Sequence, residues 1–474
     1  MNKKEDKEKK ESQLTFEKKF AFDVWDEKTT KQAFDFCQGY KEFLSACKTE
    51  RKTVAYAEKK AKEAGFERLE HIGQSAKKGF NRPLYSTNRG CSIILARPGK
   101  RPISDGVRMI LAHIDSPRLD LKIKPLFESD HIAFLKTHYY GAIKKYQWTA
   151  LPLAMHGVIV KRDGKLVEIS IGENDNDPIF MITDLLPHLS KSQLEKKLEE
   201  AITAESLNVI VAGIGTKNKD DKEPVKKNLL KLLNEKYEII EEDFVSADLK
   251  LVPAGQARDL GLDRSMVAAY GQDDRVSAYA SLMSFLGDYE NEYASVAVLT
   301  DKEEIGSQGA TSANSSYIMD FISELIFSET GHHNENILRD VFSKTKAISA
   351  DVTVAFDPDY ADVFDTINTA RIGAGVVVEK HSGSRGKYET SEATAEYTAF
   401  VRNFLNSSSI IWQTGGMGKV DVGGGGTVAM FLARLNLDIV DMGVSLLSMH
   451  APFEIASKAD IYSAYLAYRA FYES

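Results

Sequence analysis

Helix-like and strand-like stretches alternate along the chain, as judged from where apolar and polar residues fall. The stretch 53–64 is rich in Ala, Lys and Glu and stops at Gly65, which predicts a helix, whereas the apolar run 109–112 predicts a strand. After Pro253 the pattern predicts a helix over 277–286, strands over 295–299 and 346–354, a helix over 392–405, a strand over 438–443 and a C-terminal helix. Such alternation is typical of a layered α/β fold.

The pattern changes between residues 122 and 252, which predicts an inserted domain. Strand-like pieces cover 156–161, 166–171 and 207–212, and two charged stretches, 192–204 and 225–239, predict helices. The main domain is then built from two parts, 15–121 and 253–474. Residues 1–14 are a mixed-charge stretch with no apolar segment behind it, so we expect a mobile charged arm rather than a targeting sequence.

The composition is that of a globular protein with more than one structural unit. The 474 residues exceed the size at which a single core keeps growing, and 43% hydrophobic and 27% charged residues are ordinary values. No apolar run approaches membrane-spanning length, so no membrane partner is expected. Three cysteines without a CxxC pair fit a reducing compartment and predict a cytoplasmic location. The net charge of -8 argues against nucleic acid as a partner and favours peptides or small molecules.

Acidic and histidine residues follow several strand-like runs, at the position where open α/β sheets bind ligands. They are His113 in MILAHIDSP, Asp273 in GQDDRVSAY, Glu303 and Glu304 in VAVLTDKEEIGS, Asp351 in AISADVTV and His450 in LLSMHAPFE. Two histidines with carboxylates suit zinc, manganese or cobalt rather than copper or an iron–sulfur cluster. The chain therefore offers the donor set of a divalent-metal site.

Some of these residues also have an ordinary structural interpretation. A lone histidine after a strand is more often a hydrogen-bonded core or surface residue, which applies to His113 and to His450. Asp115 favours the metal interpretation of His113, because two positions along an extended segment its carboxylate projects on the same side and orients the imidazole. Asp273 fits a helix N-cap as well as a bridging carboxylate.

The carboxylates of Glu303, Glu304 and Asp351 are more informative. Adjacent carboxylates at the end of the run SVAVL point in different directions, so one can bind metal while the other transfers protons. A solvated acidic turn explains Asp301 and Lys302 better than the glutamate pair, which leads into a small-residue segment. Asp351 lies between apolar runs, where an unpaired carboxylate is costly, so a cation or a hydrogen-bond partner is expected.

Together these motifs resemble the aspartyl aminopeptidase family of metallopeptidases, over most of the chain from about Ala112 to Asp460. The matching segments are HIDSP at His113, GQDDR at Asp273, DKEEIGS at Glu303 and Glu304, ISAD at Asp351 and SMHAPFE at His450. The resemblance implies a three-layer α/β/α catalytic domain interrupted by a smaller, mainly-β dimerisation domain, and a homo-oligomer that is a dodecamer. It also implies a metal-dependent aminopeptidase with two divalent ions, zinc first, with manganese or cobalt as alternatives.

The resemblance further implies a role for each site residue. Asp273 would bridge two ions, His113 and Asp351 would bind one of them, and Glu304 and His450 would bind the other. Glu303 would be the general base and Asp115 the residue that orients His113. In this mechanism Glu303 takes a proton from the attacking water and returns it to the amine that leaves.

Two departures from the family pattern bear on substrate preference. Eukaryotic members carry a second histidine four residues after a Pro-His-Leu triplet; here His188 lies in such a triplet and the later position is Ser192. The lysine that contacts acidic substrate side chains in that branch falls near Glu379 or Lys380. The chain looks more like the bacterial branch, and its preference for acidic N-terminal residues stays open.

Two other functions stay open at this point. One is a related two-metal enzyme of different specificity, such as a glutamyl or leucyl-type aminopeptidase or an acyl-amino-acid hydrolase. The other is a non-catalytic assembly protein on the same fold, against which Glu303 and the five predicted metal ligands argue.

Overall fold

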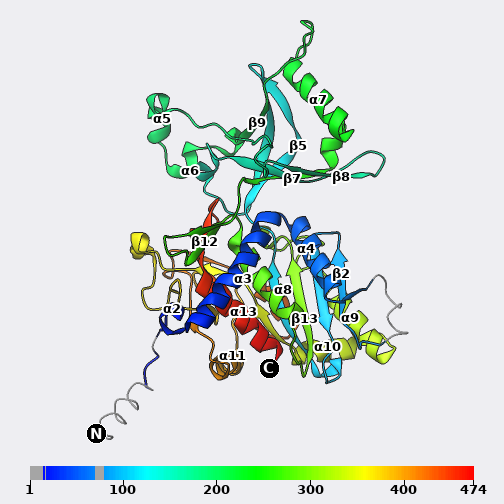
Figure 1. The fold of residues 1–474 in the computed structure, drawn as a ribbon, viewed down its shortest axis with the longest axis vertical. Coiled ribbons are helices and arrows are strands. Elements are labelled where there is room, and N and C mark those ends of the chain that lie inside the picture. The colour runs from blue at the N-terminus through cyan, green and yellow to red at the C-terminus, as the bar shows by residue number, and fades with distance from the viewer. Residues whose placement is uncertain (1–13, 17, 70–78) are drawn as a thin grey trace.

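A mixed sheet forms the centre of the larger, lower part of the protein in Figure 1. The computed structural model describes residues 14–16, 18–69 and 79–474, and within these the sheet has nine strands. In spatial order the strands are β1 (Glu67–Arg68), β2 (Leu84–Asn88), β3 (Ser92–Arg97), β13 (Ala294–Thr300), β4 (Val107–His113), β14 (Lys346–Ser349), β20 (Asp438–Gly443), β16 (Val376–Glu379) and β18 (Trp412–Thr414). The central strands β13, β4, β14 and β20 run parallel, so their carboxyl ends meet at one edge.

Helices cover both faces of this sheet and produce a three-layer α/β/α arrangement. The residues of β4 alternate between the layers: Ile110 and Ala112 pack on one side, whereas Met109 and Leu111 pack on the other. On the first side lie α3 (Glu27–Ala46), α4 (Glu50–Glu63), α8 (Gln272–Leu286), α11 (Ala395–Ser407) and α13 (Lys458–Tyr472). On the second side lie α9 (Tyr317–Thr330), α10 (Glu335–Lys344) and α12 (Ala429–Ala433). The predicted α/β fold is confirmed, and burial on both faces explains the continuous apolar run at 109–112.

An antiparallel sheet forms the separate upper lobe of Figure 1. In spatial order its strands are β8 (Leu166–Ile171), β7 (Leu153–Val160), β10 (Ala247–Pro253), β5 (Arg118–Ser129), β6 (Ile132–Tyr140) and β9 (Asn208–Ala212), and α7 (Pro224–Tyr237) packs against β6. The strands predicted over 156–161, 166–171 and 207–212 and the helix predicted over 225–239 are confirmed as β7, β8, β9 and α7.

The helix predicted over 192–204 is wrong. Two short helices, α5 (Lys191–Leu194) and α6 (Leu198–Ala201), take its place. Leu194 and Leu198 stay exposed and Ile202 is the buried large apolar residue of this stretch, so the stretch packs no continuous apolar face. Most helical stability in proteins comes from such packing, which explains why one long helix does not form.

A third sheet lies beside the carboxyl edge of the main one. Its strands, in spatial order, are β11 (Arg258–Leu260), β12 (Met266–Ala269), β22 (Glu454–Ser457), β21 (Ser445–Leu447) and β15 (Thr353–Val354). The single strand predicted over 346–354 is therefore wrong, because β14 ends at Ser349 and Thr353 belongs to this other sheet. The N–H of Ala350 donates to Leu111 O and that of Thr353 donates to Val444 O, so the chain changes sheet between them. This break carries Asp351 out of the main sheet.

The α-helix and strands not yet named are α2 (Ala21–Val24) and the short pair β17 (Gly383–Ser384) and β19 (Gly424–Gly425). The arm expected at 1–14 lies outside the described residues except for Leu14. Every helix in the described part of the chain is too short or too polar to cross a lipid bilayer. The three cysteines are buried free thiols.

Candidate metal centre

The residues predicted to bind metal converge at the carboxyl edge of the central parallel strands, although they come from distant parts of the chain. They lie at the end of β4 (His113), in the first turn of α8 (Asp273), in the turn after β13 (Glu303 and Glu304), after β14 (Asp351) and in the loop between β21 and β22 (His450). Because parallel strands place their carboxyl ends together, residues that follow different strands become neighbours there.

Asp273 lies between the two histidines. Its Oδ1 is 3.1 Å from His113 Nε2, and its Oδ2 is 3.0 Å from His450 Nε2. Glu304 Oε2 is 3.6 Å from the same atom of His450. Asp351 Oδ1 is 3.6 Å from His113 Nε2. The carboxylate of Asp273 therefore faces two groups of side chains at once, one on each oxygen.

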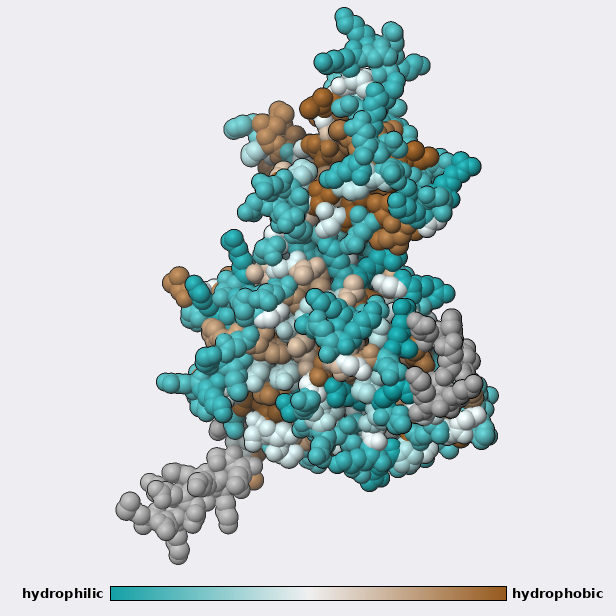
Figure 2. Space-filling view, turned by 45° about the vertical axis from the view of Figure 1, so that its right-hand side comes forward, coloured by the Kyte–Doolittle hydropathy of each residue, from teal (hydrophilic) through white to brown (hydrophobic). Residues whose placement is uncertain are grey.

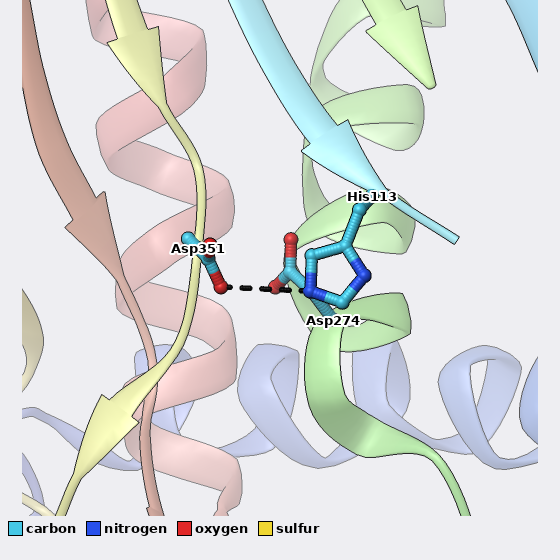
Figure 3. A group of neighbouring side chains, drawn as sticks. All are labelled: His113, Asp274 and Asp351. Atoms are coloured by element: carbon cyan, nitrogen blue, oxygen red, sulfur yellow. Dashed lines mark ion pairs between the residues drawn. The ribbon is translucent and has the colours of Figure 1, made fainter. Parts of the chain in front are cut away.

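Asp274 also belongs to the cluster, and the sequence reasoning missed it. Figure 3 shows the side chains of His113, Asp274 and Asp351 pointing toward one another from β4, α8 and the residues after β14. One ligand atom from each of the three lies within 4.8 Å of the others, and all three residues are buried. The two adjacent aspartates in GQDDR could have pointed to Asp274, because the same pattern of adjacent acids identifies Glu303 and Glu304.

Asp115 anchors the turn that carries the glutamate pair. Its Oδ1 accepts the N–H of Glu303 at 3.1 Å, and its Oδ2 accepts the N–H of Glu304 at 3.2 Å. The same carboxylate lies 3.4 Å from His113 Nδ1. Tyr140 OH donates a further hydrogen bond to Oδ2 at 2.8 Å. Asp115 is buried, so these contacts fix both the imidazole and the turn.

Both histidines present the same ring nitrogen to the carboxylates. His113 Nδ1 lies 3.1 Å from the backbone oxygen of Asp115, and His450 Nδ1 lies 3.0 Å from that of Ala142. A carbonyl only accepts hydrogen bonds, so Nδ1 carries a proton in each ring. Both Nε2 atoms face Asp273: a protonated ring donates a hydrogen bond to this carboxylate, and a neutral ring would offer its lone pair to a cation there.

The site holds more carboxylates than cationic side chains, and the imbalance shifts its pKa values. Burial raises the pKa of Glu303 to about 8 and raises the pKa of Glu304 and of Asp274 well above the usual range. Burial disfavours a charged His450, but the hydrogen bond to Asp273 and the charge of Glu304 outweigh it and raise the pKa of His450 to about 10. Protons offset part of the negative charge here, as a bound cation would in their place.

Buried oxygens without a hydrogen-bond partner lie in the same cluster. Among the described residues, no donor meets Glu304 Oε1 or either carboxylate oxygen of Asp274. Such oxygens are costly unless a donor or a cation reaches them. A second trio of ligand atoms, from His113, Asp273 and Glu304, also lies within 4.8 Å. Imidazole and carboxylate together suit zinc, so the residues present fit a divalent-metal site.

Backbone contacts hold the segment that carries the two aspartates. Gly271 has φ +68°, and a Cβ there would collide with the guanidinium of Arg275. Arg275 is fully buried and donates to the carbonyls of Gly271, Tyr270 and Cys47. The peptide bond between Asp273 and Asp274 is cis. Arg275 therefore ties the start of α8 to the C-terminal end of α3.

Glu454 is a second residue that the sequence reasoning missed. Its Oε2 accepts the N–H of Asp273 at 3.0 Å, and its Oε1 accepts the N–H of His450 at 2.7 Å. Glu454 is buried and begins β22. It ties the loop of His450 to the segment of Asp273. The segment SMHAPFE ends at this glutamate, but no sequence pattern around Glu454 predicts that it contacts the metal ligands.

The positions that bear on substrate preference lie outside the cluster. His188 is exposed on a turn of the upper lobe. Lys380 is exposed after β16, with its Nζ 3.8 Å from Glu392 Oε1. Glu379 is buried, and Thr353 Oγ1 donates to its carboxylate.

Histidines and carboxylates gathered at the carboxyl edge of a parallel sheet, beside a partly buried glutamate, are typical of the class of metal-dependent hydrolases. Residues 43–472 match the family model described as Aminopeptidase I zinc metalloprotease (M18). A Clostridium acetobutylicum protein described as a probable M18 family aminopeptidase 1 is 47% identical over 461 residues, which cover 97% of this chain and 98% of that protein.

Solved structures give the same result. The crystal structure of an M18 family aminopeptidase from Thermotoga maritima matches with a TM-score of 0.92 at 43% identity, over 97% of this chain and 100% of that chain. The structure of the S. cerevisiae mApe1 dodecamer matches with a TM-score of 0.73 at 17% identity, over 92% of this chain and 96% of that chain, which is a likeness in fold.

The chain belongs to the M18 family of zinc metalloproteases and is an aminopeptidase. The family resemblance drawn from the five sequence motifs is confirmed, as is the expectation of a hydrolase.

Proposed function

We propose that this aminopeptidase holds two divalent cations, zinc first and manganese or cobalt as alternatives, with Asp273 shared between them. His113 and Asp351 would hold one cation, and Glu304 and His450 the other. The observation that carries this proposal is that the two oxygens of Asp273 face the Nε2 atoms of different histidines. The match to a zinc metalloprotease family supports zinc.

Glu303 is the proposed general base. Divalent cations supply Lewis-acid chemistry when bound: they polarise a peptide carbonyl and make water more acidic. Glu303 Oε2 lies 3.9 Å from His113 Nε2, at the rim of the cluster, and Asp115 holds its backbone N–H. The Glu303 carboxylate takes a proton from the attacking water and returns it to the amine that leaves. Without a bound cation, burial raises the pKa of Glu303 to about 8, and a bound cation would favour the ionised carboxylate that acts as the base.

The proposed substrates are peptides with a free N-terminus. A substrate panel with zinc supplied tests this: aminoacyl anilides carrying acidic, neutral and basic residues, and N-acetylated amino acids. We expect hydrolysis of anilides with a free amine and no hydrolysis of the acetylated compounds. Turnover of acetylated amino acids alone would contradict the proposal and favour an acyl-amino-acid hydrolase. The acidic and neutral anilides decide whether acidic N-terminal residues are preferred.

We also propose a homo-oligomer, a dodecamer by likeness to the S. cerevisiae structure, with residues 122–252 as its dimerisation domain between catalytic parts 15–121 and 253–474. Figure 2 shows hydrophobic side chains gathered on the upper lobe. In one stretch of this lobe the exposed large apolar residues are Ile179, Met181, Leu185, Leu186, Leu189, Leu194 and Leu198. Soluble monomers rarely expose a large apolar patch, so contact between copies of the chain explains it.

A double substitution, Leu186→Glu with Leu189→Glu, is expected to reduce the assembly to dimers or monomers, because charges would be buried at the proposed contact. Sedimentation velocity measures the mass. Leu262→Glu is the matched control, since Leu262 is an exposed leucine of the lower part. A wild-type chain that sediments as a monomer would contradict the proposed assembly.

A cytoplasmic location is proposed as well. The cysteines Cys37, Cys47 and Cys91 are buried as free thiols. Disulfides are common in oxidising compartments and rare in the cytoplasm, so free thiols support the proposal.

A further inference from the structure

The end of β6 brings the upper lobe into contact with the metal centre proposed above. Three consecutive residues lie beside three residues of the centre: Tyr140 OH donates to Asp115, Ala142 O accepts from His450, and between them Gly141 passes so near Glu304 that an added Cβ would touch it. We propose that this segment, 140–142, positions both histidines of the centre, so that the upper lobe is a working part of the active site. The inference rests on the proposed function, because it assigns a role in holding the same metal ligands.

Tyr140 acts on the His113 side of the centre. Its hydroxyl donates to Asp115 Oδ2 at 2.8 Å. Asp115 lies 3.4 Å from His113 Nδ1 and accepts the N–H of Glu303, so its orientation sets both residues. Losing the tyrosine hydroxyl removes one of the donors that fix this carboxylate, and the imidazole and the turn of Glu303 lose alignment together.

The ring of Tyr140 is itself held from both parts of the protein. Tyr140 is paired with Arg118 across β6 and β5, and the Arg118 guanidinium lies 3.8 Å from the centre of the tyrosine ring. Arg118 Nη1 lies 3.8 Å from Glu50 Oε2 on α4 of the lower part. Arg118 is buried, so the stacked pair is protected from solvent on the guanidinium side. The hydroxyl is therefore aimed at Asp115 by contacts on both sides of the lobe junction.

Gly141 and Ala142 act on the His450 side. Ala142 O accepts the Nδ1 proton of His450 at 3.0 Å, which leaves Nε2 free to face Asp273. Gly141 has φ +71°, and a Cβ there would lie 3.2 Å from Glu304 Oε2 and 3.3 Å from Glu304 Cβ. An added Cβ would therefore be tight against Glu304, which would have to shift by a few tenths of an ångström, and the positive φ independently favours glycine.

Tyr140→Phe tests the first contact, because it keeps the ring against Arg118 and removes only the hydroxyl. We expect kcat to fall by about 10- to 100-fold with little change in KM, and zinc affinity to fall by a similar factor. Zinc affinity is measured by competition with a chromophoric chelator, in the absence of substrate. Tyr139→Phe is the matched control: Tyr139 is exposed and points to the opposite face of β6, so both values should stay at wild type.

Gly141→Ala tests the second contact. The new methyl group would push on Glu304 and move the carbonyl of Ala142 away from His450, so zinc affinity and kcat should fall by about 10-fold or more. Gly164→Ala is its control, since Gly164 has φ +82° in a turn of the same lobe and no neighbour within 4 Å of an added Cβ. Gly164→Ala carries the same backbone strain without the contact and should bind zinc as the wild type does.

Measurements on the wild type distinguish failure of the positioning role from failure of the proposed function. A wild type that binds zinc and cleaves peptides, with Tyr140→Phe and Gly141→Ala both unchanged in zinc affinity and kcat, overturns the positioning role alone. A wild type that neither binds zinc nor cleaves peptides overturns the proposed function, and this inference with it. Loss in both variants, with both controls unchanged, supports a segment of the upper lobe that holds the metal ligands in place.

Discussion

Glu303→Gln is expected to lower kcat by about 10²- to 10⁴-fold while the zinc content of the protein stays the same. Glutamine keeps the size of the side chain and its backbone contact with Asp115, but it cannot accept and return a proton. Glu303 lies at the rim of the cluster rather than between the histidines, so the proposed ligands remain complete without it. Steady-state kinetics on the best anilide and metal analysis of the same samples measure the two quantities.

The control for this substitution is Glu235→Gln, an exposed glutamate on α7 of the upper lobe, which should leave kcat unchanged. Wild-type turnover by Glu303→Gln would remove Glu303 from the mechanism. Loss of zinc in the same variant would instead identify Glu303 as a metal ligand, and Glu304 would then be the candidate for the general base.

Asp273→Asn is expected to lower activity at least as much, for a different reason. The carboxylate presents one oxygen to His113 Nε2 and the other to His450 Nε2, and asparagine replaces one of these oxygens with an NH₂ group that cannot bind a cation. We expect bound zinc to fall from two ions per chain to one or none, and kcat to fall by about 10²-fold or more. Metal analysis after dialysis against a weak chelator gives the stoichiometry.

Asp175→Asn, at an exposed aspartate of the upper lobe, is the matched control and should retain full zinc content. Two zinc ions per chain in Asp273→Asn would show that this carboxylate is not shared. Asp274 and Asp351 would then be the carboxylates to assign to the two metal sites. A wild type with a single ion per chain would contradict the two-metal proposal directly.

Local patterns predicted most of the helices and strands because their cause is local. The run 109–112 is apolar at every position because β4 is buried on both faces, and the stretch 53–64 has the composition of the helix α4. The two errors, at 192–204 and at 346–354, depend on distant contacts. Leu194 and Leu198 are exposed in the described part of the chain, and the break at Asp351 exists because Thr353 pairs with a strand that lies almost a hundred residues further on.

By itself the sequence determined the α/β class, the family motifs and the types of residue that could bind metal, since these depend on spacing along the chain and on side-chain chemistry. Only the tertiary structure decided which atoms meet. Asp274, Glu454 and Tyr140 follow no local rule that marks them, and each contacts the cluster because folding brings α8, β22 and β6 to one edge of the sheet. A hydrogen bond or a shared cation acts over about 3 Å, so such partners are defined by position in space and not by order in the chain.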